Sequence, residues 1–227
     1  AEVILRDKQF CNLTEIIVRA TDSISDLRKK VRIAAIIGTF QATLTRFNFL
    51  SEKWKSNTQE EALLGVSMTG IMDNPLTAGL QGKEKLSKVL DELREYVVEV
   101  NKEWSAILGI NPSAATTSVK PSGTISQLCD TASGIHARHA HQYIRTVRID
   151  KKDPVYSMLK DQGLYIEDDK MRPDSTAVVY FSQRSPKGSV TRNDMTALEQ
   201  LDIWLVYQRH WCEHKPSVTI SVKENEW

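Results

Sequence analysis

The segment LLGVSMTGI, residues 63–71, predicts a buried strand and indicates the class of the fold. It is a short run of apolar and small residues without a charge, and such runs are typical of strands covered on both faces, as in parallel sheets flanked by helices. Gly70, Asp73, Asn74 and Pro75 follow, and residues of these types lead a strand into a loop. The segment therefore favours an α/β fold.

Strand-like and helix-like patterns alternate along the rest of the chain. Further strands are expected, from β-branched or alternating residues, at 11–18, 114–119, 143–149, 176–181 and 217–222. Helices are expected, from apolar residues at helical spacing, from Ser25 to about Phe49, from Leu86 to Trp104, directly after Pro154 and over 191–211. This alternation favours an α/β fold with mainly parallel strands in a single domain over residues 1–227. About six strands do not obviously close a barrel.

Composition excludes several classes of partner. Thirty basic residues against 29 acidic ones leave a net charge of +1, which favours neither nucleic acid nor a membrane surface as a partner. No apolar run is long enough to span a bilayer, and no signal-peptide pattern opens the chain. Three cysteines, Cys11, Cys129 and Cys212, are too few and too scattered for a disulfide scaffold. We therefore expect a cytoplasmic protein.

The segment SVKPSGTISQL, residues 118–128, has the residue types of an anion-binding turn. Gly123 lets a ligand approach the backbone, while Ser122, Thr124 and Ser126 offer hydroxyl groups beside the N–H groups of an expected helix start. An ordinary helix-capping turn is the alternative, because Ser and Thr are common caps. The spacing of a Walker phosphate loop is absent.

Two histidine-rich segments allow other interpretations. HARHAH, residues 136–141, lacks a recognisable ligand spacing and is interpreted as a basic loop facing solvent or a phosphate. HWCEH, residues 210–214, matches the inverted zincin pattern H-x-x-E-H. On a helix, His210 and His214 would share a face and Glu213 could act as a base, so a zinc peptidase is an alternative function.

Five motifs, taken in their order, resemble the C-terminal half of the catalytic subunit of a ribonucleotide reductase. They are AEVILRDKQFCNLTE, GVSMTGIMDNP, TTSVKPSGTISQL, GIHARHAHQYIRTVRI and HKPSVTISVKENEW, and they extend over essentially the whole chain. The likeness is greatest to the adenosylcobalamin-dependent (class II) monomeric ribonucleoside-triphosphate reductases. Class I large subunits usually carry an acidic residue where Gly123 stands here.

The resemblance implies half of a ten-stranded α/β barrel and a set of site residues. In the family, a radical cysteine and a glutamate form a Cys-x-Glu motif; Glu2 matches the glutamate, and the cysteine would directly precede Ala1. Cys11 matches one of the two cysteines that reduce the substrate. The implied substrate phosphate loop consists of Ser122, Gly123, Thr124, Ile125 and Ser126. Adenosylcobalamin is the implied cofactor, contacted from about Tyr156 onward, and no protein-ligated metal is expected.

The implied chemistry suits these residue types. A thiyl radical abstracts the 3′-hydrogen of the ribose, Glu2 takes the 3′-hydroxyl proton, and a thiol protonates the departing 2′-hydroxyl. A cysteine pair that includes Cys11 supplies two electrons and becomes a disulfide, which a thioredoxin-like protein or a dithiol reopens. The phosphate loop would hold a ribonucleoside triphosphate, or a diphosphate, so that its ribose faces Glu2 and Cys11.

The resemblance also implies that these 227 residues are a fragment and have no reductase activity alone. The open edge of its sheet should associate with the missing N-terminal half of the barrel. Two further alternatives remain besides the zinc peptidase. One is a class I large-subunit fragment, against which the lack of a Tyr-Tyr pair near the C-terminal strands counts. The other is a non-catalytic nucleotide-binding module that retains only the phosphate loop.

Overall fold

The structure, a computed structural model, describes residues 2–227, which form two compact units. The larger unit contains the residues up to Arg138 together with Pro186–Trp227, and the smaller unit is His139–Ser185. The expectation of one domain over residues 1–227 stays a prediction.

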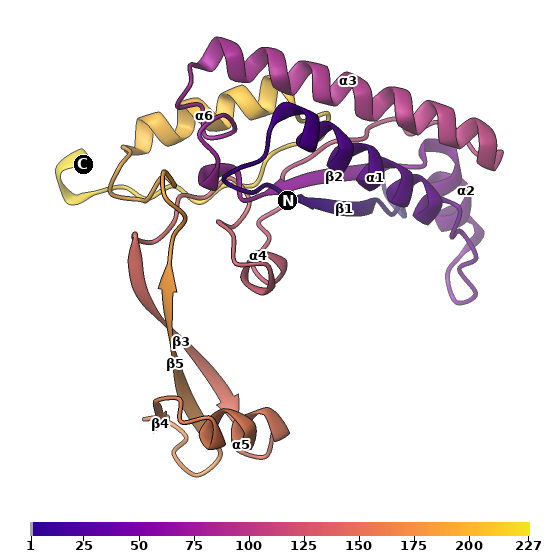
Figure 1. The fold of residues 1–227 in the computed structure, drawn as a ribbon. Coiled ribbons are helices and arrows are strands. Elements are labelled where there is room, and N and C mark those ends of the chain that lie inside the picture. Colours follow the sequence, from indigo (N-terminus) through magenta and orange to yellow (C-terminus); the bar gives the residue numbers. More distant parts are fainter. Residues whose placement is uncertain (1) are drawn as a thin grey trace. The chain divides into compact units, whose positions relative to one another are not determined.

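A parallel strand pair lies at the centre of the larger unit. Strand β1 (Asn12–Ile17) pairs with β2 (Leu64–Thr69) in a register that runs from Asn12 opposite Leu64 to Ile17 opposite Thr69 (Figure 1). Both strands were expected from the sequence, and both are confirmed. The connection between them contains a helix, as parallel pairing requires.

Two further segments continue this parallel arrangement without forming regular strands. Isolated parallel bridges join Val66 to Thr117 and Val119 to Pro216. The strand expected at 114–119 is therefore an extended segment that lies beside β2. The strand expected at 217–222 is not formed, although the backbone N–H of Ser217 donates to Val119.

Helices α1 (Ile24–Ala42), α3 (Lys83–Leu108) and α6 (Ala197–His210) lie on one side of the parallel pair, and the single turn α4 (Ile125–Leu128) lies on the other, as Figure 1 shows. The larger unit also contains α2 (Glu52–Glu61) and the short 3₁₀ turns η1 (Ile71–Asp73) and η2 (Glu224–Glu226). The first helix ends at Ala42, not near Phe49 as expected. No described helix could span a membrane.

The two faces of the strand pair differ in chemistry, because neighbouring residues of a strand point to opposite faces. Leu64, Val66 and Met68 are fully buried in the hydrophobic core. Leu64 packs on Gly38 of α1, where an added Cβ would lie 3.1 Å from the leucine side chain. The opposite face of β2 carries the small residues Gly65, Ser67 and Thr69, so it leaves room for polar side chains.

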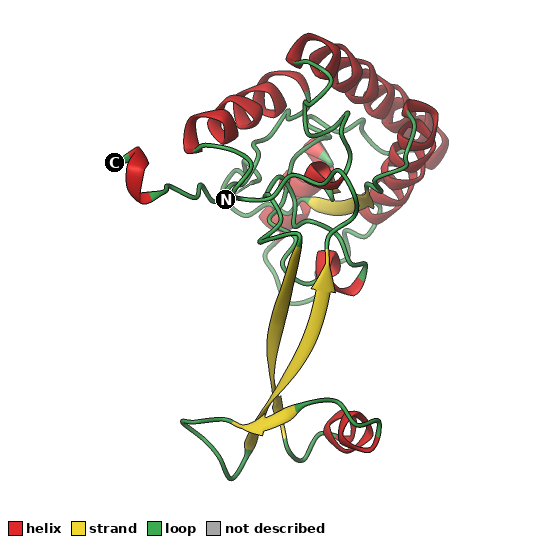
Figure 2. Cartoon of the chain, turned by 60° about the vertical axis from the view of Figure 1, so that its left-hand side comes forward, coloured by secondary structure: helices red, strands yellow, loops and turns green. Residues whose placement is uncertain are grey.

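The smaller unit is an antiparallel sheet in the order β3–β5–β4 (Figure 2). Its elements are β3 (Gln142–Asp150), α5 (Pro154–Asp161), β4 (Ile166–Asp168) and β5 (Thr176–Arg184). The strands at 143–149 and 176–181 and the helix after Pro154 are confirmed, but the expectation of mainly parallel strands is wrong here. A hairpin connection allows only antiparallel pairing of β4 with β5.

Gly70 provides a test of the junction between β2 and the loop that follows. Its φ is +83°, and an added Cβ would lie 2.3 Å from the backbone oxygen of Val18. Gly109 also has a positive φ, +68°, but has nothing within 4 Å of that position. Both alanine variants place a side chain in left-handed backbone, at about 1–2 kcal/mol, whereas only Gly70→Ala also overpacks the core, at about 1–3 kcal/mol more.

We therefore expect urea unfolding to show a larger loss of stability for Gly70→Ala than for Gly109→Ala. Equal losses in the two variants would contradict the described approach of Gly70 to β1.

Candidate functional site

Cys11 lies directly before β1, and its half-buried thiol faces His214. The distance from Cys11 Sγ to His214 Nε2 is 3.9 Å. Burial, and to a smaller extent the carboxylate of Glu2, raise the pKa of Cys11 to about 12. The structure thus brings Glu2 and Cys11 close enough for their charges to interact, and it keeps Cys11 as a neutral thiol at physiological pH.

His214 connects three segments around this thiol. Its Nε2 lies 2.8 Å from the backbone oxygen of Leu64, which can only accept, so Nε2 carries the proton. Its Nδ1 then accepts from the backbone N–H of Ile4 at 3.3 Å. Burial lowers the pKa of His214 and therefore favours the neutral ring. In this form both ring nitrogens have a hydrogen-bond partner.

Gly65 allows the side chains of Leu13, Ser118 and Cys11 to approach one another closely. At the point where a Cβ on Gly65 would lie, Leu13 Cδ2 is 2.4 Å away, Ser118 Oγ 3.1 Å and Cys11 Sγ 3.5 Å, so these side chains already fill that position. The Ser118 side chain is buried, and its hydroxyl has no hydrogen-bond partner among the described residues. A buried hydroxyl without a partner is uncommon in native structures and is often completed by a bound molecule.

The zincin pattern does not form a metal site. Helix α6 ends at His210, whose Nδ1 pairs with Asp91 at 2.8 Å. Glu213 accepts from the backbone N–H and the hydroxyl of Thr116 at 2.6 and 2.7 Å, and His214 faces Cys11. The three side chains point to different partners, and no described group of three or more potential ligands converges. The zinc peptidase interpretation is therefore wrong.

The HARHAH segment divides between the two units. His136 belongs to the larger unit, where its Nδ1 lies 2.7 Å from the backbone oxygen of Ser133 and its Nε2 accepts from the backbone N–H of Thr219 at 2.9 Å. His139 and His141 belong to the smaller unit. Both ring nitrogens of His136 are thus engaged in contacts with the backbone.

The loop at 122–126 presents unpaired donors. Ser122 is buried with a φ of +51°, and its hydroxyl has no hydrogen-bond partner among the described residues. Gly123 and Thr124 are exposed, and within the part of the chain that the structure describes their N–H groups donate to no acceptor. The helix start expected here is α4, a single turn, so its dipole is small.

Ser126 and Ile125 have different surroundings. The Ser126 hydroxyl donates to the backbone oxygen of Ser122 and lies 2.8 Å from Ser133 Oγ. This side chain therefore braces the loop from inside. Ile125 is partly exposed beside it.

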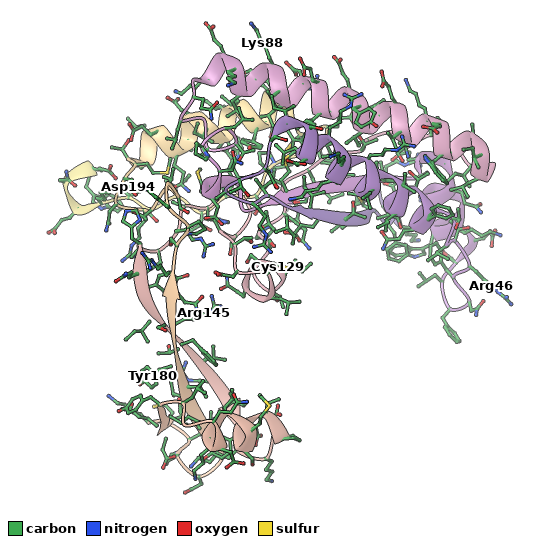
Figure 3. All side chains as sticks on the ribbon, in the orientation of Figure 1. Arg46, Lys88, Cys129, Arg145, Tyr180 and Asp194 are labelled. Carbon is green, nitrogen blue, oxygen red and sulfur yellow. The ribbon has the colours of Figure 1, made fainter. Side chains whose placement is uncertain are left out.

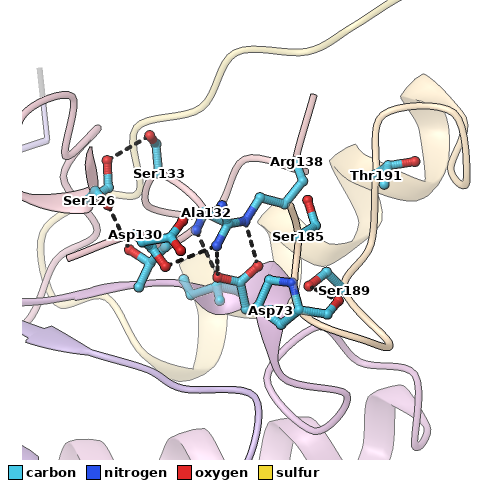
Figure 4. Close-up of polar contacts among 12 residues, drawn as sticks. Asp73, Ser126, Asp130, Ala132, Ser133, Arg138, Ser185, Ser189 and Thr191 are labelled. Atoms are coloured by element: carbon cyan, nitrogen blue, oxygen red, sulfur yellow. Dashed lines mark hydrogen bonds and ion pairs between the residues drawn. The ribbon is translucent and has the colours of Figure 1, made fainter. Parts of the chain in front are cut away.

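Behind the loop lies an ion pair that the sequence did not reveal (Figure 4). Arg138 Nε is 2.8 Å from Asp73 Oδ1, and Arg138 Nη2 is 2.8 Å from Asp73 Oδ2. Both side chains are at least 96% buried. The two residues occur in separate motifs, GVSMTGIMDNP and GIHARHAHQYIRTVRI, and nothing in either motif predicts that they pair.

Comparison with known proteins identifies related enzymes. The adenosylcobalamin-dependent ribonucleoside-triphosphate reductase of Euglena gracilis is 29% identical over 224 residues, which cover 97% of this chain and 29% of that protein. The enzyme of that name from Lactobacillus acidophilus is 26% identical over 251 residues, covering 99% and 33%. No family model matches. The chain spans about a third of the length of these curated relatives.

A solved structure agrees with these relatives. A crystal structure of a B12-dependent (class II) ribonucleotide reductase superimposes with a TM-score of 0.84 at 24% identity, over 99% of this chain and 35% of that chain. The chain resembles one segment of a class II ribonucleotide reductase. The resemblance predicted from the five motifs is confirmed, as is the α/β fold class.

The residues expected to contact adenosylcobalamin, from Tyr156 onward, are divided between the two units. A hollow of about 500 Å³ in the smaller unit is lined by residues 142–144 and 182–184. Pockets of roughly 300–1,000 Å³ suit drug-sized ligands, and a cobalamin is considerably larger. This hollow alone is therefore too small for the whole cofactor.

Glu2 and Cys11 allow a direct test of their proximity. In a Cys129→Ser/Cys212→Ser background, Glu2→Gln removes the charge that helps to raise the pKa of Cys11. Figure 3 shows Cys129 beside α4, away from the buried core. The rate of Cys11 alkylation by iodoacetamide at pH 9 should rise roughly two- to fivefold, because the thiolate is the reactive form.

Glu103→Gln, on the exposed side of α3, serves as the control and should leave that rate unchanged. An unchanged rate in Glu2→Gln would show that the two side chains do not interact.

Proposed function

We propose that this chain supplies the glutamate, one redox cysteine and the substrate phosphate loop of an adenosylcobalamin-dependent ribonucleotide reductase. The observation that carries the proposal is that the backbone oxygen of Glu2 accepts from the N–H of Lys215 at 3.3 Å, next to His214, whose Nε2 lies 3.9 Å from the Cys11 thiol. The names of the relatives support the reaction and the cofactor. The whole protein would reduce ribonucleoside triphosphates to deoxyribonucleotides for DNA synthesis.

The chemistry divides between the two side chains. Glu2 would accept the proton of the 3′-hydroxyl after a thiyl radical has taken the 3′-hydrogen. Cys11 would be one of two thiols whose oxidation to a disulfide supplies two electrons and two protons, as the 2′-hydroxyl leaves as water. A thiol, not a thiolate, carries the proton that this step needs, which agrees with the raised pKa of Cys11.

The loop at 122–126 would hold the phosphates of the substrate. The Ser122 hydroxyl and the N–H groups of Gly123 and Thr124 are donors that lack acceptors within the chain. Phosphate oxygens are strong acceptors for such groups. Binding at this loop would fix the ribose relative to the thiols, which is where much of the rate gain of such enzymes arises.

The remaining proposed partners are the rest of the barrel and a reductant. The described residues form a groove of about 470 Å³ along β1 and α1, lined by Leu13, Ile17, Ile33 and Ile37 among others. Ile33 and Ile37 are more than half exposed. We infer that the rest of the barrel, including its N-terminal half, covers this edge. A thioredoxin-like protein or dithiol would reduce the disulfide, in the cytoplasm.

Ser122→Ala should separate binding from stability. The substitution removes a buried hydroxyl that has no partner, and alanine must adopt the same positive φ as Ser122. The stability of the protein should therefore be unchanged or slightly higher. Binding of inorganic triphosphate, measured by calorimetry on the same protein, should weaken about tenfold to a hundredfold, since hydrogen bonds to charged groups contribute roughly 1.5–3 kcal/mol. Weaker binding that is accompanied by an equal loss of folding would contradict the assignment.

Gly123→Asp tests the charge of the site. A Cβ on Gly123 would have nothing within 4 Å, and its φ is not in the left-handed region. The Gly123→Asp variant should therefore fold normally, but its carboxylate should repel a triphosphate. Gly123→Ala is the control, because it also adds a Cβ but carries no charge. Triphosphate affinity that is the same in both variants would place the anion elsewhere.

Turnover separates the reductase from a non-catalytic nucleotide-binding module. The 227-residue chain alone should reduce no ribonucleotide. The full-length protein that contains it should form deoxyribonucleotide with adenosylcobalamin and a dithiol, and Glu2→Gln and Cys11→Ser should each abolish steady-state turnover. Retained turnover in either variant, or activity of the 227 residues alone, would contradict the proposal.

A further inference from the structure

We propose that the buried Asp73–Arg138 pair is a positioning device that fixes the conformation of the loop at 122–134. The role of this loop in holding phosphates rests on the proposed function above. The positioning itself rests on contacts within the larger unit, and the two parts can fail separately.

The pair joins the end of β2 to the far side of the loop. Asp73 lies in η1, one turn beyond the last residue of β2. Besides Arg138, its Oδ2 accepts from the backbone N–H of Ala132 at 2.8 Å. The backbone N–H of Gly70 donates to the oxygen of Ala132 at 2.7 Å. Ala132 is thus held on both sides by residues that continue the central strand.

Arg138 supports a residue whose backbone is strained. Asp130 has a φ of +48°, which is uncommon for a residue with a side chain. Arg138 Nη2 donates to the backbone oxygen of Asp130 at 3.1 Å, and Nη1 donates to its carboxylate at 3.2 Å. A left-handed residue of this kind persists only where its surroundings hold it, and the guanidinium supplies that support.

The contacts continue from this point to Ser122. The backbone N–H of Thr131 donates to the oxygen of Ser126 at 2.8 Å. Ser133 Oγ lies 2.8 Å from Ser126 Oγ, whose hydroxyl donates to the backbone oxygen of Ser122 (Figure 4). Ser122 and Asp130 are the two residues of the loop other than glycine that have a positive φ. Its orientation therefore depends, through Ser126 and Ser133, on the part of the chain that Asp73 and Arg138 hold.

Net stability alone does not account for an ion pair in this position. Removing two charges from water is expensive, and buried pairs are often no more stabilising than apolar residues of similar size. What the pair provides that apolar residues would not is direction: besides the two hydrogen bonds between Arg138 and Asp73, Arg138 donates to Asp130 and Asp73 accepts from Ala132. This favours a role in setting loop geometry.

Hydrogen exchange tests the positioning directly. Arg138→Lys keeps the charge but loses the paired geometry, and Asp73→Asn/Arg138→Gln keeps hydrogen-bonding groups without charge. In either variant, exchange at the amides of Thr131, Ala132 and Gly134 should accelerate by about tenfold or more while β1 and β2 stay protected, because the loop opens locally. Lys83→Gln, which breaks the exposed pair with Asp202, should change none of these amides.

Faster exchange spread evenly over β1, β2 and the loop in both variants would overturn the proposal, because it would show only a general loss of stability. Unchanged loop exchange would overturn it equally. Inorganic triphosphate binding to the unsubstituted protein is measured in parallel. Its absence would contradict the phosphate role of the loop and leave the exchange result to decide the positioning.

Discussion

The parallel backbone pairing of β1 with β2 is the constraint on which the rest of the larger unit depends. Because side chains alternate along these strands, Leu64, Val66 and Met68 must enter the core beneath the helices. Gly65 and Ser67 then necessarily face the other way. Cys11 lies at the beginning of this second face, and the loop with Ser122 follows the neighbouring extended segment. One pairing therefore determines both the core and the placement of the polar groups.

Uncharged polar groups dominate the surroundings of Cys11. Burial keeps the thiol protonated and favours the neutral form of His214, and the Ser118 hydroxyl has no hydrogen-bond partner among the described residues. Such surroundings suit hydrogen-atom and proton transfer at a thiol better than attack by a thiolate. The same histidine that the zincin pattern suggested as a metal ligand here joins Ile4, in the segment of Glu2, to Leu64 at the start of β2.

Local sequence patterns predicted the helices and strands whose formation depends on neighbouring residues. They failed for elements and contacts that depend on residues distant in the sequence. The apolar run at 63–71 and the apolar spacing of α3 predicted their elements, because burial leaves a periodic signature. Helix α2 was missed since its sequence EKWKSNTQEE is polar almost throughout and only Thr58 is buried. The motif order predicted the fold family, yet the Asp73–Arg138 pair joins residues 65 positions apart, and no local pattern reports such a contact.

We propose that Cys11 is oxidised when a ribonucleotide is reduced. A single turnover tests it most directly: full-length protein is mixed with adenosylcobalamin and a ribonucleoside triphosphate, without external reductant, and its disulfides are then mapped by mass spectrometry. We predict about one deoxyribonucleotide per active site, with Cys11 recovered in a disulfide in equal amount. Deoxyribonucleotide formed while Cys11 remains a free thiol would contradict the account.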